Sequence, residues 1–164
     1  ALPNFRRALS IANTLEDKLQ ISERNKGIGI VHYNLAAYDS ASHYLSKSDS
    51  IFFYLGTSNN RLTTLSWLAI TAMKAGNKSQ AQNHFQSFNE LIEQYDPDDK
   101  DIISMNWNMY QAHQLAGDKK PAKEYLENSY LELKTRSKKI KNKTDRKQYL
   151  SVKLHQDISD AWDL

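Results

Sequence analysis

The sequence contains no cysteine, which excludes disulfide bonds and thiolate metal sites. It also has only 5 Gly and 3 Pro among 164 residues, which disfavours an all-β fold with its many turns. No apolar run approaches the ~20 residues that a membrane-spanning helix needs, and the N-terminus lacks an apolar signal-peptide core. We therefore expect a helical protein with no membrane partner and, since no export signal is visible, a cytoplasmic location.

The excess of positive over negative charge is also small. The 22 basic and 19 acidic residues leave a net charge of +3, which is too weak to indicate nucleic acid as a partner. Basic residues nevertheless cluster near the C-terminus: Lys134, Arg136, Lys138, Lys139, Lys141, Lys143, Arg146 and Lys147. Clustered lysines and arginines can bind phosphates by releasing counterions. A solvated helix face is the better interpretation, because no base-reading motif accompanies the cluster.

An internal repeat is present. The segments 28–41, 68–81 and 109–122 each contain an apolar stretch, a short turn and an alanine that opens a second helix. These alanines, Ala41, Ala81 and Ala122, lie 40 and 41 residues apart. One further step back reaches Ala1, so we expect the chain to begin on the second helix of a truncated repeat, as a fragment of a longer protein.

Apolar residues within the repeats recur at spacings of three and four, which places them on one face of a helix. Gly76 and Gly117 can adopt positive φ and are expected to end the first helix of their repeats. The segments 56–60 and 96–99 are rich in turn-forming residues and predict loops between repeats. In residues 81–95 the apolar stripe comprises Ala81, His84, Phe85, Phe88, Leu91, Ile92 and Tyr95.

This arrangement resembles the tetratricopeptide repeat, in which a small residue on the first helix meets a small residue that opens the second. Gly29 and Ala41 match that pattern, as do Ala69 and Ala81. Tyr110 departs from it, as do Phe88 and the 40-residue period. The long period is more similar to the repeats of bacterial regulatory ATPases, cyclases and transcription activators. The resemblance implies an all-α fold, an α-solenoid of antiparallel helix pairs with a C-terminal capping helix.

On this basis the whole chain, 1–164, is predicted to form a single domain. Its predicted parts are the second helix of a truncated repeat (1–21), three repeats (22–60, 61–100 and 101–142) and the capping helix (143–164). Thr144 or Asp145 is expected to cap the last helix. We expect Trp162 to pack beneath this cap, because a terminal repeat needs a more polar outer face.

The resemblance also implies a concave groove lined by the first helix of each repeat. Aromatic and amide side chains there suit a peptide, because rings supply area and amides bond to its backbone. Alternatively, Trp67 and Trp107 are interhelix core residues. The predicted groove residues are Lys26, Ile30, Tyr33, Asn34, Thr63, Ser66, Trp67, Ile70, Lys74, Trp107, Asn108, Gln111 and Gln114.

No chemistry-bearing motif accompanies the repeat. The sequence has no P-loop, no G-x-S-x-G and no histidine pair at the His-x-x-x-His spacing of a zinc site. His32 and His113 occupy equivalent repeat positions and are expected to pack on the partner helix. We therefore expect no enzyme activity, no catalytic residue, no metal site and no cofactor.

The predicted function is a protein-interaction or regulatory module within a larger signalling or transcription-regulatory protein. Its partner would be a peptide, another domain of the same chain, or a second copy that associates by stacking repeats. One alternative is a domain of a transcription activator that senses a ligand or signalling peptide. The other alternative is a nucleic-acid contact through the basic C-terminal helix.

Overall fold

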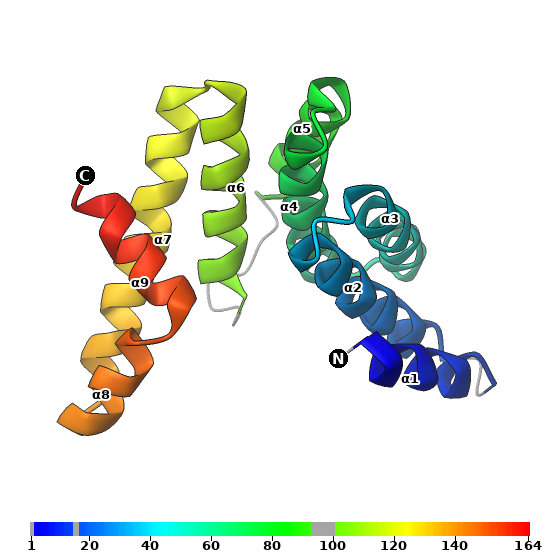
Figure 1. Cartoon of the computed structure of the whole chain (residues 1–164), viewed down its shortest axis with the longest axis horizontal. Coiled ribbons are helices and arrows are strands. Elements are labelled where there is room, and N and C mark those ends of the chain that lie inside the picture. The colour runs from blue at the N-terminus through cyan, green and yellow to red at the C-terminus, as the bar shows by residue number, and fades with distance from the viewer. Residues whose placement is uncertain (1, 15–16, 93–100) are drawn as a thin grey trace. The chain divides into compact units, whose positions relative to one another are not determined.

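The computed structural model describes residues 2–14, 17–92 and 101–164. These residues form helices and contain no strand, which confirms the predicted all-α fold (Figure 1). The helices are α1 (Leu2–Thr14), α2 (Lys18–Asn34), α3 (Tyr38–Leu55), α4 (Ser58–Lys74), α5 (Lys78–Ile92), α6 (Ile102–Ala116), α7 (Lys119–Lys139), α8 (Lys143–Leu150) and α9 (Lys153–Trp162).

The chain divides into two compact units, 1–96 and 97–164. The first unit holds α1–α5 and the second holds α6–α9. Within them, α2 with α3, α4 with α5 and α6 with α7 are the most extensively packed pairs. The connections within these pairs are short, so the paired helices run antiparallel. The neighbouring helices thus pack as a helical repeat, and the single domain remains a prediction.

Equivalent side chains join the two helices of the first and third pairs. Ser48 of α3 donates its hydroxyl to the Ser22 carbonyl of α2, with 3.0 Å between the oxygens. Ser129 of α7 makes the same bond to the Ile103 carbonyl of α6, again at 3.0 Å. All of these residues except Ile103 have no exposed surface, and Ile103 is 4% exposed. The second pair has apolar Leu62 and Phe88 at the same positions, both fully buried.

A small residue is required where α2 meets α3. A Cβ added to Gly29 would lie only 2.6 Å from the Leu45 Cγ and 3.2 Å from the Ala41 carbonyl oxygen. The third pair has Tyr110 at this position, where the ring is partly buried against the core of the second unit. The departure from a small residue at Tyr110 therefore changes the local packing while the helix pair is kept.

The turns within the three pairs share a left-handed residue. Gly76 and Gly117 have φ values of 78° and 89°, which confirms the prediction that they end their helices in this conformation. The equivalent residue of the first pair is Ala36, whose φ is 57°. An L-residue with a Cβ is disfavoured there by about 1 kcal/mol relative to glycine.

The predicted loop 56–60 is shorter in the structure. Gly56, with φ 67°, and Thr57 form the whole connection, and α4 already begins at Ser58. Helix α2 likewise begins at Lys18, within the predicted segment 1–21, because the Asp17 carboxylate accepts a hydrogen bond from the Gln20 amide. The other predicted loop, 96–99, and Tyr95 of the predicted stripe lie outside the described residues.

The end of the chain is two short helices, α8 and α9, where the sequence predicted one capping helix. Asn142, and not Thr144 or Asp145, caps α8, because its side chain accepts hydrogen bonds from both of those amides. Trp162 stacks on Tyr130 of α7, with ring centroids 4.8 Å apart, as expected of a residue beneath the cap. These rings cover a core made of Ile103, Leu126, Leu133 and Ile158.

Candidate binding face on α2 and α4

An aromatic cluster forms where α2 meets α4 and the start of α3. The Tyr33 ring meets Trp67 of α4 edge-on, with centroids 5.2 Å apart, and approaches Tyr38 of α3 at 5.8 Å. Burial, with a smaller contribution from Tyr38, raises the pKa of the Tyr33 phenol to about 12. The phenol is therefore protonated at neutral pH and can donate a hydrogen bond.

A polar cluster joins the middle of α2 to the first turn of α4. Lys26 forms an ion pair with Glu23, at 3.0 Å between Nζ and Oε2. Asn60 of α4 donates a side-chain hydrogen bond to the same Glu23 carboxylate, which ties α4 to α2. The Lys26 side chain is only 12% exposed, and its ammonium lies 5.4 Å from the centre of the Phe52 ring. Lys26 is thus paired within its own helix and contacts α3 through the Phe52 ring.

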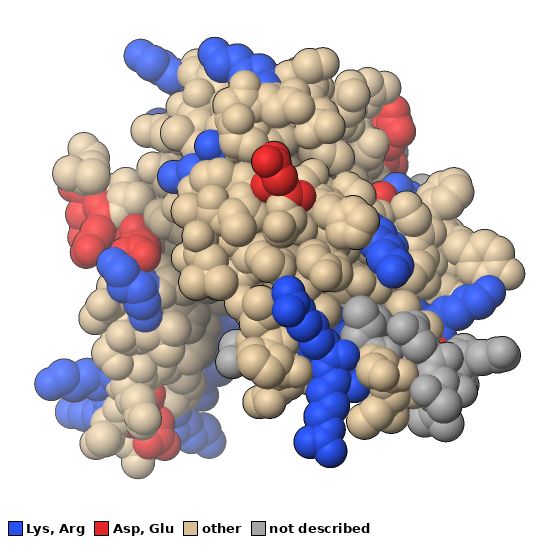
Figure 2. Space-filling view, turned by 45° about the vertical axis from the view of Figure 1, so that its right-hand side comes forward, with Lys and Arg blue, Asp and Glu red and all other residues tan. Residues whose placement is uncertain are grey.

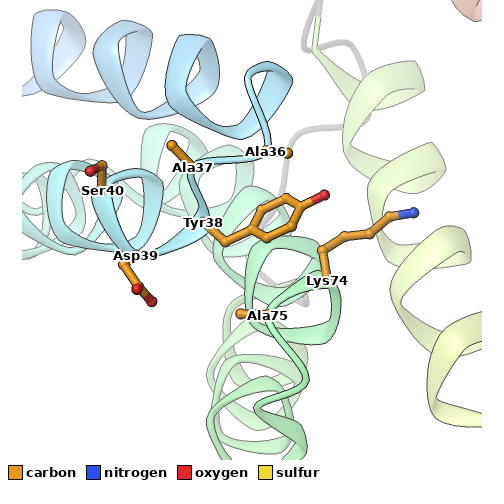
Figure 3. A pocket seen from close by; sticks show the side chains of 7 residues that line it. All are labelled: Ala36, Ala37, Tyr38, Asp39, Ser40, Lys74 and Ala75. Carbon is orange, nitrogen blue, oxygen red and sulfur yellow. The ribbon is translucent and has the colours of Figure 1, made fainter.

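A hollow of about 460 Å³ opens beside the aromatic cluster (Figure 3). One wall is the turn from α2 into α3, which includes Tyr38, and the other is the end of α4. Small alanine side chains contribute much of the lining, so a partner backbone can approach closely. The lining residues are Ala36, Ala37, Tyr38, Asp39, Ser40, Lys74 and Ala75.

The predicted groove residues differ in burial. Asn34, Lys74 and Gln114 are exposed. Thr63, Ser66, Ile70 and Asn108 are buried. The hydroxyls of Thr63 and Ser66 donate to carbonyls of their own helix, those of Asn59 and Thr63. The remaining residues are half-buried: Lys26, Ile30, Tyr33, Trp67, Trp107 and Gln111.

The structure brings the α2 and α4 members of the predicted groove together through Tyr33 and Trp67. The α6 members belong to the second unit. There Trp107 contacts Tyr110, with centroids 5.1 Å apart, and both rings pack on the core of that unit. This favours the core interpretation for Trp107, whereas the half-buried Trp67 lies in the aromatic cluster beside the hollow.

The sequence did not single out Tyr38 or Asp39, which line the hollow, or Glu23 and Asn60 of the polar cluster. The predicted groove comprised only residues of the first helix of each repeat, whereas Tyr38 and Asp39 are the first residues of a second helix. Tyr38 follows Ala36 and Ala37, where the other two repeats have the glycine and a polar residue. This apolar turn was the available signal.

The two equivalent histidines pack as predicted. His32 stacks on Tyr44 and His113 on Tyr125, each pair with centroids 5.5 Å apart and nearly parallel rings. His113 Nδ1 also lies 3.1 Å from the Asp118 carboxylate. In the part of the chain that the structure describes, no three His, Cys, Asp or Glu residues are grouped so as to hold a metal ion.

Part of the basic C-terminal run has a structural role. Arg136 pairs with Glu132 at 2.6 Å, and Arg146 donates to the Ile140 carbonyl just after α7. The lysines of the run are exposed. Figure 2 shows basic and acidic side chains scattered over the face turned to the viewer, with no single charged patch. Among the described residues, no helix is long and apolar enough to span a membrane.

Comparison with known proteins adds no family. The sequence matches no protein-family model, and no curated protein is significantly similar to it. The site must therefore be interpreted from its own geometry.

Proposed function

We propose that the α2–α4 face, which comprises the aromatic cluster and the hollow beside it, binds a protein segment and that the chain is an interaction module of tetratricopeptide type. The observation that supports this most directly is the contact of Tyr33 with Trp67 beside the hollow that Tyr38 lines. Aromatic side chains that are partly buried and partly open supply large contact area at a small cost in side-chain entropy. They dominate the energetics of many interfaces.

The described geometry suits a short peptide better than a flat domain surface. The volume of the hollow, about 460 Å³, lies within the range of small-ligand pockets, about 300–1,000 Å³. The Tyr33 phenol can donate a hydrogen bond, and the exposed Asn34 amide can bond to a peptide backbone. Such a segment could come from a separate protein, from another domain of the same chain or from a second copy. We place the module within a larger signalling or transcription-regulatory protein.

Selection from a random peptide display library tests the proposal. The wild-type chain should enrich peptides, and Trp67→Ala should weaken binding of the enriched peptides by at least tenfold, because an aromatic hot spot is worth about 2 kcal/mol or more. Tyr54→Ala is the matched control. Tyr54 is 72% exposed on α3 and does not line the hollow, so its loss should leave affinity unchanged.

Circular dichroism must show that the Trp67→Ala chain keeps its helicity. Tyr38→Ala provides a second test, because Tyr38 lines the hollow directly. Folded variants at both positions that bind the enriched peptides as well as the wild-type chain would contradict the proposal, as would a wild-type chain that enriches no peptide.

A further inference from the structure

The hollow carries one charge of each sign. Lys74 ends α4, and Asp39 lies in the first turn of α3. Both line the hollow, and both are exposed. In Figure 3 the Lys74 ammonium and the Asp39 carboxylate point away from each other, and the Tyr38 ring lies between them. They are therefore separate binding points at two sides of one hollow.

The two charged side chains differ from their neighbours in their ion pairing. Among the described residues, neither Lys74 nor Asp39 forms an ion pair. Lys26 and Arg61 differ in this respect, because Lys26 pairs with Glu23 and Arg61 pairs with Asp49 at 3.0 Å. Lys26 and Arg61 thus have a structural role on these helices, whereas Lys74 has no ion-pair partner among the described residues.

We propose that the hollow selects a peptide segment that carries an acidic and a basic side chain, with the carboxylate at Lys74 and the cation at Asp39. This inference rests on the proposed peptide-binding function of the α2–α4 face. Complementary charges chiefly determine which partner binds and in which register, since a like charge at either point is repelled. Two opposite charges at separate points also determine the direction in which the segment crosses the hollow.

The surface between Lys74 and Asp39 consists of alanines and the Tyr38 ring, and it contacts the partner residues that separate the two charged side chains of the partner. Ala36, Ala37 and Ala75 offer small apolar surfaces without a charge. The partner residues there should be uncharged, because a third charge would lose hydration with no pairing group. Since both charged side chains are exposed, the affinity for the peptide should fall as the salt concentration rises. Salt screens exposed charges over about 8 Å at physiological ionic strength.

Peptide selection on charge variants tests the inference. The wild-type chain should enrich peptides with an acidic and a basic residue in one fixed order. The double variant Lys74→Glu/Asp39→Lys should enrich the reverse order. Lys74→Gln and Asp39→Asn should each weaken binding of the wild-type peptide by about two- to fivefold, as expected of ion pairs between exposed charges. Lys47→Glu is the matched control, because Lys47 is an exposed lysine of α3 outside the hollow and should leave the selected order unchanged.

The outcomes separate this inference from the proposed function. If Trp67→Ala abolishes binding but the double variant enriches the same charge order as the wild-type chain, the peptide-binding function holds and the charge assignment is wrong. If no variant and no wild-type chain enriches a peptide, both fail. A thermal shift produced by free zwitterionic amino acids, without any enriched peptide, would make the hollow a small-molecule site and would also overturn the inference.

Discussion

The first and third helix pairs, α2–α3 and α6–α7, join their helices in the same way but have different residues at the left-handed position of their turns. A histidine stacks on a tyrosine in each, and a buried serine bonds to a carbonyl of the first helix in each. Yet Ala36 occupies the left-handed turn position in the first pair and Gly117 in the third. The contacts between helices therefore define the pair, and the turn can vary. In the first pair, the turn residues Ala36 and Ala37 form part of the wall of the hollow.

Closing the space between α2 and α3 should have the largest effect. Gly29→Leu forces a side chain into Leu45, so we expect the free energy of unfolding to fall by about 3 kcal/mol, near the upper end for overpacking. Urea denaturation followed by circular dichroism measures this. Gly76→Ala is the control, because a Cβ there meets open space and costs only about 1 kcal/mol of backbone strain. Equal losses in the two variants would refute the tight packing at Gly29.

Removing the equivalent serines should lower the free energy of unfolding by a smaller amount, and by different amounts in the two pairs. Ser48→Ala removes the donor to the Ser22 carbonyl and leaves the Ser22 hydroxyl with fewer partners, since those two hydroxyls also lie 3.2 Å apart. We expect a loss of about 2 kcal/mol. Ser129→Ala removes one bond and should cost about 1 kcal/mol. A loss at Ser129 as large as the loss at Ser48 in the same denaturation assay would contradict this prediction.

Exchanging the turn residues should produce the smallest effects, with opposite signs. Ala36→Gly relieves a left-handed alanine and should stabilise the protein by about 0.5–1 kcal/mol. Gly117→Ala introduces the same strain and should destabilise it by about 1 kcal/mol. Differential scanning calorimetry measures both as shifts in melting temperature. A destabilised Ala36→Gly chain would mean that contacts of the Ala36 methyl group outweigh its backbone strain.

Local and periodic features of the fold could be predicted from the sequence. The 40-residue period predicted the helix pairs. Gly76 and Gly117 predicted two of their turns, because positive φ strongly favours glycine. The packing of His32 and His113 followed from their equivalent positions. Element ends were harder, because a single side-chain hydrogen bond decides them. Asn142 caps α8 in preference to its neighbours, and Asp17 starts α2 early.

The candidate site depended on tertiary contacts that no local pattern contains. The sequence singled out Tyr33, Trp67 and Lys74, but of these only Lys74 lines the hollow, together with Tyr38 and Asp39 from the start of α3. Which first-helix positions are buried depends on how the helices approach one another. Thr63 and Ser66 were predicted to face a partner, yet they are buried with hydroxyls bonded to their own helix.

The hydroxyl pair between α2 and α3 has a mechanical consequence. Ser22 and Ser48 bond reciprocally to each other's carbonyl oxygens, and such directional bonds are satisfied at only one longitudinal position of the two helices. The second pair has Leu62 and Phe88 at these positions, and apolar side chains have no such directional requirement. Under tension along the chain, α2 and α3 should resist sliding, whereas α4 and α5 should shear first.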